Sequence, residues 1–191
     1  MEKKKLQTLY IKNNKSAKEI ADSFGFSQNK VNYWMKKHNI KKRTISDAIY
    51  LKNNPDGDPF LFVKPKTPED FKLLGMGLGL YWGEGTKADK VSVRLGNTDP
   101  KLIKTFMFFL IKIFSVKKKD LHFSLQIFSD MPKQEALTFW TKYLGVNEKQ
   151  FYKTTVTVSG KIGTYRQKTK HGVLIMYYHN KKFRDLLVSM L

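Results

Sequence analysis

The sequence has no cysteine and few acidic residues, and each shortage excludes a class of function. Without cysteine the chain cannot form disulfides, thiolate zinc sites or cysteine nucleophiles. Its 16 Asp and Glu stand against 36 Lys and Arg, which gives a formal net charge of +20. A basic excess of this size indicates a polyanionic partner, and nucleic acid is the polyanion we expect.

Long hydrophobic runs are also missing. The apolar stretch between Lys72 and Glu84 is well short of the ~20 residues that span a membrane. The start of the sequence, residues 1–5, lacks the apolar core of a signal peptide. We therefore expect no membrane partner and a cytoplasmic, nucleoid-associated protein. A ribosomal protein would share the charge, but the domain patterns described next favour another DNA- or RNA-binding class.

The first fifty residues carry the pattern of a helix-turn-helix motif. Ser16 and Glu19 are spaced as a capping box, in which each side chain satisfies the other residue's free amide. A small residue at Ala21, Gly25 four positions later and Val31 six after that match the spacing of the DNA-binding helix-turn-helix. The pattern resembles that family, and the resemblance implies that the second helix reads DNA.

Ser27 is expected to cap this second helix, whose exposed side carries amides and lysines. Asn and Gln can pair with adenine through a donor and an acceptor, whereas Lys and Arg contact phosphates. The predicted DNA-binding residues of this region are Gln28, Asn29, Lys30, Asn32, Tyr33, Lys36, Lys37 and Arg43. The alternative is a small three-helix packing module whose lysines are simply solvated.

A glycine-spaced apolar stretch follows in the middle of the chain. Gly75, Gly79 and Gly83, which we call the glycine stripe, recur every fourth residue and would lie along one side of a helix. Each glycine costs a helix about 0.8–1 kcal/mol relative to alanine, so close approach of a second helix is the expected reason. The helix should begin with Thr67 as its cap and Pro68 in the first helical position. It should end at Glu84, with Gly85 in the left-handed conformation. A carboxylate at a helix C-terminus is unfavourable unless a cation binds there.

Residues 77–85, GLGLYWGEG, resemble the motif of the LAGLIDADG homing endonucleases. In that family two such helices pack through their small residues, and the acid at the foot of each binds the divalent metal that cleaves DNA. The resemblance implies that Glu84 is the catalytic residue and a ligand of Mg²⁺ or Mn²⁺. Because the chain has one copy of the motif, it also implies a homodimer whose interface is the glycine stripe. The chain departs from the family in having Glu for the usual Asp, and Trp82 for a smaller residue.

Three later runs alternate between polar and apolar residues, as strands of a half-buried sheet do. The predicted polar sides are Lys90, Ser92 and Arg94, then His122, Ser124 and Gln126, then Lys153 and Thr155, set against apolar sides that include Val91, Val93, Leu95, Val156 and Val158. The polar side has almost no acids, which suits a groove of duplex DNA, and the resemblance implies a saddle of antiparallel strands in the major groove. Lys87, Arg166 and Lys168 are further DNA-binding candidates by their charge.

The expected fold class is α+β. Residues 1–52 should form an all-helical helix-turn-helix domain, 53–66 a linker, and 67–191 a LAGLIDADG-like domain with a mainly antiparallel sheet packed against helices. The family's order is helix, two strands, helix, two strands, helix. Here only a stub of the first strand fits at 86–88, and an extra helix is expected at 132–144.

The leading functional hypothesis is a double-stranded DNA-binding protein that acts as a site-specific homing-type endonuclease and hydrolyses phosphodiester bonds with a divalent metal. The alternative is a transcription regulator that combines a catalytically inactive LAGLIDADG-like domain with the helix-turn-helix. A third possibility is an RNA-splicing maturase that uses the same surface. For the glycine stripe, the alternative to a dimer is that helix 132–144 packs on it within one chain, with Ala136 facing the glycines.

Overall fold

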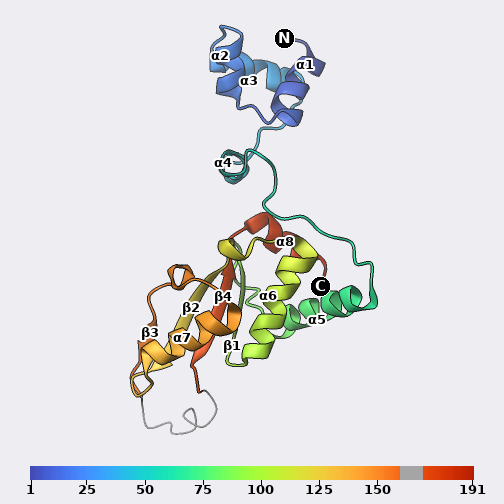
Figure 1. Cartoon of the computed structure of the whole chain (residues 1–191). Helices are drawn as coiled ribbons and strands as arrows, with labels where there is room; N and C mark the ends of the chain where they lie inside the picture. The colour runs from blue at the N-terminus through green and yellow to red at the C-terminus, as the bar shows by residue number, and fades with distance from the viewer. Residues whose placement is uncertain (160–169) are drawn as a thin grey trace. The chain divides into compact units, whose positions relative to one another are not determined.

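A computed structural model describes residues 1–159 and 170–191 (Figure 1). The chain divides into two compact units, Met1–Asp58 and Pro59–Leu191, which are treated separately below. The α+β class is confirmed, since the second unit combines helices with a four-stranded sheet. In these two ranges no helix is both long enough and apolar enough to cross a membrane.

The first unit is helical. Its elements are α1 (Lys3–Gln7), the π-helical turn η1 (Thr8–Lys12), α2 (Ala17–Ser23), α3 (Gln28–Lys37) and α4 (Ile45–Asn53). The small core that joins α1, η1, α2 and α3 consists of Leu6, Tyr10, Ile20, Ala21, Val31, Met35 and Ile40. Helix α4 contributes no buried residue and begins with its own capping box.

The α2–turn–α3 pair forms as predicted. The Ser16 amide donates to the Glu19 carboxylate at 2.7 Å, and the Glu19 amide donates to the Ser16 hydroxyl at 3.1 Å. Gly25 turns the chain with a φ of +64°, a conformation that glycine adopts without steric cost. The Ser27 hydroxyl then accepts from the Lys30 amide and caps α3. The capping box, the turn glycine and the second cap are therefore confirmed.

The second unit begins with an extended segment that pairs with the end of a helix. The amides of Leu61 and Val63 donate to the carbonyls of Phe114 and Ile113, at 2.9 and 2.7 Å. These carbonyls belong to the last turn of their helix, where no intrahelical partner exists. The later part of the predicted linker 53–66 is thus packed onto the second unit.

Helix α5 (Pro68–Glu84) carries the glycine stripe and starts as predicted, with Thr67 as cap and Pro68 in its first turn. The Thr67 hydroxyl accepts from the Asp70 amide at 3.2 Å. The Asp70 carboxylate also pairs with Lys112 of α6 (Pro100–Phe114) at 2.7 Å. The hydrogen bond from Lys112, followed by the one from the Lys66 amide, lowers the pKa of Asp70 to about 2.

The contact between α5 and α6 is made at Gly77, which lies outside the glycine stripe. A Cβ atom at position 77 would overlap the ring of Phe109 on α6, so only glycine lets the helices approach this closely. A Cβ atom at any glycine of the stripe would meet nothing within 4 Å in the described residues. The extra helix α7 (Lys133–Leu144) does not cover the stripe, and its Ala136 is buried in the main core instead. The one-chain alternative for the stripe is therefore wrong.

Replacing Gly77 by Ala should lower the free energy of unfolding of the second unit by about 1–3 kcal/mol, because the new methyl group overpacks the Phe109 ring. The matched control is Gly75→Ala, whose methyl group points into open space. It should raise stability by up to about 1 kcal/mol through helix propensity. Urea unfolding of dilute protein measures both. Equal stabilities for the two variants would contradict the close contact at Gly77.

The sheet is formed by β1 (Val93–Asn97), β2 (His122–Phe128), β3 (Thr155–Thr157) and β4 (Val173–Tyr178), in the order β1-β4-β2-β3. Strand β4 runs antiparallel to β1 and β2, while β3 pairs parallel to β2. The sheet is therefore mixed: β4 has an antiparallel neighbour on each side, and β3 is the one strand of these four that pairs parallel. Helix α8 (Lys181–Ser189) and two short 3-10 turns, η2 (Lys118–Asp120) and η3 (Glu148–Gln150), complete the unit.

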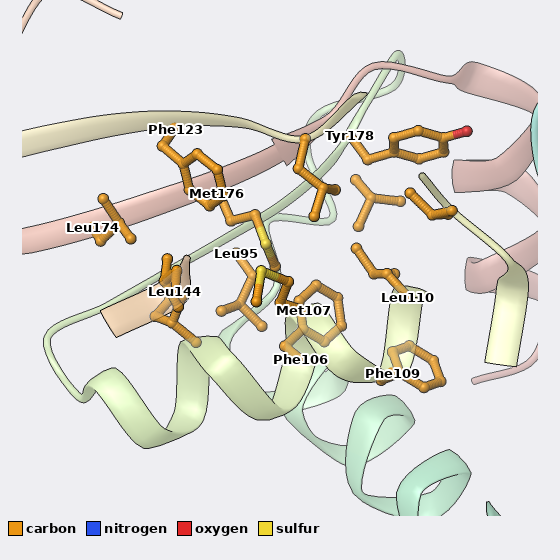
Figure 2. Close-up of a cluster of buried hydrophobic side chains, with 14 of the residues drawn as sticks. Leu95, Phe106, Met107, Phe109, Leu110, Phe123, Leu144, Leu174, Met176 and Tyr178 are labelled. Carbon is orange, nitrogen blue, oxygen red and sulfur yellow. The ribbon is translucent and has the colours of Figure 1, made fainter. Parts of the chain in front are cut away.

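The core lies on one side of this sheet. Strand residues that point to this side are buried against the helices: Val93, Leu95, Phe123, Leu125, Ile127, Leu174, Met176 and Tyr178. Figure 2 shows Leu95, Phe123 and Met176 from three strands facing Phe106 and Met107 of α6. The alternate strand residues are half-buried or exposed, and we call their side the open face of the sheet.

The first predicted strand face is wrong at Ser92. The Asp89 carboxylate accepts hydrogen bonds from the amides of Val91 and Ser92 and from the Ser92 hydroxyl. This turn delays the start of β1 to Val93, buries Ser92 and leaves Val91 exposed. Ser92 is therefore removed from the candidate DNA-binding residues.

The third predicted strand is also different. Strand β3 has three residues, all exposed, and it pairs with β2 through them. Val156 and Val158, which were expected to face the core, are 52% and 80% exposed. An edge strand this short can expose both of its sides, so alternation alone did not indicate burial here.

Helix α5 ends differently from the prediction too. Gly85 is extended, with φ −72° and ψ 139°, where a left-handed residue was expected. It forms a single antiparallel bridge to Leu95, and the Thr86 amide donates to the Arg94 carbonyl at 2.9 Å. A side chain at Gly85 would overlap Tyr81, so the glycine permits a close approach. The expected stub of a first strand is reduced to this bridge.

Candidate nucleic-acid interface

The predicted reading helix α3 presents its candidates on one surface. Gln28, Lys30 and Lys37 are exposed. Four further candidates line one hollow together with Lys42: Asn29, Asn32, Tyr33 and Lys36. Amide, phenol and ammonium groups thus meet in one depression of the first unit.

Arg43 has a different place. Its backbone amide donates to the Tyr10 hydroxyl at 2.9 Å, and its guanidinium lies over the Tyr10 ring at 4.3 Å. The guanidinium also donates to the carbonyls of Asn14, at 3.0 Å, and Tyr10. These bonds fasten the segment after α3 to η1, so Arg43 has a structural role that its predicted phosphate contact would have to share.

The strand register aligns the other candidates in rows across the open face. Arg94 of β1, Tyr177 of β4 and His122 of β2 form one row. The next rows are Gly96, Ile175 and Ser124, and then Val173, Gln126 and Thr155. Five predicted residues thus share this face, and none of the aligned residues is acidic.

A cluster of aromatic rings, which we call the ring cluster, lies on the same face. It consists of His122, Tyr152, Tyr177 and His179, and His122 alone among them was a predicted DNA-binding residue. The rings of His122 and Tyr152 are stacked with centroids 5.6 Å apart, and so are the rings of Tyr177 and His179. The two pairs also touch, because His122 and His179 have ring centroids 5.6 Å apart. Alternation in the last strand could have revealed Tyr177 and His179, which lie opposite the buried Met176 and Tyr178.

A hydrogen bond links two of these rings. The Tyr152 hydroxyl and the Nε2 atom of His179 are 2.7 Å apart. Burial lowers the pKa of His179, and the neighbouring His122 lowers it further. Burial likewise raises the pKa of Tyr152. The unprotonated nitrogen of a neutral imidazole can accept a hydrogen bond from a phenol, so we assign the Tyr152 hydroxyl as the donor and the Nε2 atom of His179 as the acceptor.

Position 84 lies at the foot of α5. Glu84 is exposed, and the nearby Lys87 ammonium donates to the carbonyls of Tyr81, at 3.4 Å, and Trp82. Carboxylate and carbonyl oxygens are ligands that Mg²⁺ prefers. However, within residues 1–159 and 170–191 no three His, Cys, Asp or Glu side chains gather as a metal site. The Glu84 carboxylate is thus the kind of ligand that such a metal prefers, and it does not belong to a group of three such side chains within these residues.

The remaining candidates are scattered. Lys90 and Lys153 are exposed on the second unit, outside the aligned rows. Arg166 and Lys168 lie outside the described residues.

Comparisons of the chain with protein-family models, curated proteins and solved structures find no match. The likeness to homing endonucleases therefore rests on the motif and on the helix that carries it.

Proposed function

We propose that the protein binds double-stranded DNA through α3 of the first unit and through the open face of the second. The observation that carries this proposal is the alignment of Arg94, His122, Ser124, Gln126 and Thr155 on a sheet face where none of the residues in register is acidic. The hollow on α3 supports it with amides next to lysines. The net charge of +20 supplies the attraction to phosphates.

We further propose that this DNA-binding protein is a homing-type endonuclease. Glu84 is exposed at the end of a glycine-striped helix, in the position of the metal-binding acid of the LAGLIDADG motif. A bound Mg²⁺ or Mn²⁺ would supply Lewis-acid activation of water and of the leaving oxygen. The part of Glu84 is to hold that ion beside the DNA backbone.

The proposed enzyme is a homodimer, and the exposed side of α5 supports this. The glycine stripe is open, and Phe71, Met76 and Trp82 are exposed on the same helix by 58%, 44% and 63%. An apolar helix surface of this kind is normally covered by a partner. A second copy would cover it and bring a second Glu84 to the same place, completing what one chain lacks.

The second candidate function is a transcription regulator that binds DNA without cutting it. It is favoured by the single acid at the foot of α5, because a regulator needs no metal site. Both candidates share the DNA-binding surfaces, and they differ only in the chemistry at Glu84.

Binding-site selection from random duplexes tests the DNA-reading part of the proposal. Asn32→Ala should relax the selected sequence, because an amide that pairs with a base edge is lost. Lys37→Ala is the matched control on the same helix and should weaken all sequences by a similar factor. Recovery of the wild-type sequence by the Asn32 variant would exclude α3 as the reading helix.

A further inference from the structure

The ring cluster differs from what the solvent side of a sheet usually carries. Polar residues such as Thr, Lys or Glu are expected there, whereas the cluster consists of aromatic rings. Four rings from β2, β4 and the segments after η3 and β4 gather on it. Tyr152 remains 45% exposed although it contacts all three other rings. Its place is fixed by its amide, which donates to the Phe123 carbonyl at 2.8 Å. The cluster is thus an aromatic surface in which the Tyr152 ring is exposed.

A cation completes this surface. The Arg94 guanidinium lies over the ring of Tyr177 with its Cζ atom 5.2 Å from the ring centroid. The cluster therefore combines stacking surfaces with a positive charge. A ligand that matches it has a flat ring and a negative charge.

We propose that the ring cluster is a stacking platform for an unpaired nucleotide in a DNA or RNA strand. Bases in a duplex cover each other's faces and offer only their edges, whereas an unpaired base offers its face to an aromatic side chain. The base would stack on the exposed part of the Tyr152 ring, and Arg94 would pair with the strand's phosphate. This inference rests on the proposed nucleic-acid binding, but it requires neither cleavage nor reading by α3.

The test is fluorescence anisotropy with labelled strands of about 16 nucleotides, the upper range of known stacking sites. Single-stranded DNA, single-stranded RNA, an abasic strand and a duplex are compared on the full chain. Tyr152→Leu should weaken both base-containing single strands about five- to 150-fold, the range that loss of base–aromatic stacking gives. Tyr152→Phe keeps the ring and should bind as the wild type does. If the tyrosine acted only through its hydrogen bond to His179, Phe would be as damaging as Leu.

Tyr33→Leu on α3 is the matched control, since Tyr33 is also an exposed tyrosine. It should weaken the duplex and spare the single strands, the reverse of Tyr152→Leu. Weakening of the abasic strand by Tyr152→Leu to the same degree, or no weakening of any strand, would overturn the platform. A higher affinity for the RNA strand or for the DNA strand would show which nucleic acid supplies the unpaired nucleotide. Duplex binding by a protein whose single-strand binding does not change in Tyr152→Leu refutes this inference alone, whereas Tyr152-dependent single-strand binding without duplex binding refutes the proposed function alone.

Discussion

Duplex DNA affinity should fall by about 10³- to 10⁵-fold when the salt concentration rises from about 50 to about 200 mM. The reason is that each Lys or Arg that neutralises a phosphate releases a condensed counterion, and salt opposes this release. Lys30, Lys36 and Lys37 in the first unit and Arg94 in the second supply such contacts in the proposed complex. Titration of a labelled duplex at several salt concentrations gives the slope directly.

Two variants locate the contacts that produce this slope. Replacing Lys36 and Lys37 together by Ala should reduce the slope by about 2 for each bound copy of the chain, one for each lost phosphate contact. Lys101→Ala is the control, because Lys101 is exposed at the start of α6, on the helical side of the sheet. It should leave the slope unchanged. An affinity of the wild type that does not vary with salt would refute the electrostatic basis of the proposal.

Glu84→Gln should abolish metal-dependent cleavage and leave duplex binding almost intact. The substitution keeps the size of the side chain and removes the charge that holds the cation. The measurement is cleavage of a randomised plasmid library with Mg²⁺ or Mn²⁺, next to binding of the same variant to a duplex. Glu135→Gln, an exposed acid in the first turn of α7, is the control and should cut as the wild type does.

Two outcomes of this experiment would decide between the candidate functions. Undiminished cutting by Glu84→Gln would exclude Glu84 as a metal ligand. A wild type that cuts nothing with either metal would favour the regulator.

The proposed cleavage also requires the proposed homodimer. Sedimentation of the protein, free and bound to DNA, measures whether it is a monomer or a dimer. Gly79→Leu fills the open stripe and should shift the protein to a monomer and stop cutting, because the two helices can no longer approach. A wild type that is monomeric under both conditions would contradict the paired arrangement of Glu84.

Local signals in the sequence were sufficient wherever the interacting groups lie within a few residues. The caps at Ser16, Ser27 and Thr67 form as predicted, because each bond joins neighbours in the chain. The alternation of β2 also predicted correctly that Phe123 faces the core and His122 the open face. These features give the α2–turn–α3 pair, the start of α5 and the central part of the sheet.

The failures arose where polar–apolar alternation was the only signal used. At Ser92 the Asp89 carboxylate captures two amides and forms a turn, which competes with the strand. At Val156 the alternation is present but no layer covers the edge strand. The ring cluster combines residues from distant parts of the chain, so its partners could be recognised only once the register of β4 against β2 was known.

The extended segment before α5 determines where the second unit can be cut from the chain. Leu61 and Val63 supply donors to the last carbonyls of α6, and the Phe62 ring lies 5.5 Å from that of Phe114. These amides should therefore exchange their hydrogens more slowly than amides that are hydrogen-bonded to water. A shortened protein that starts at Pro59 retains this cover. One that starts at Thr67, the predicted start of the second domain, would expose Phe114 and leave the helix end without its partners.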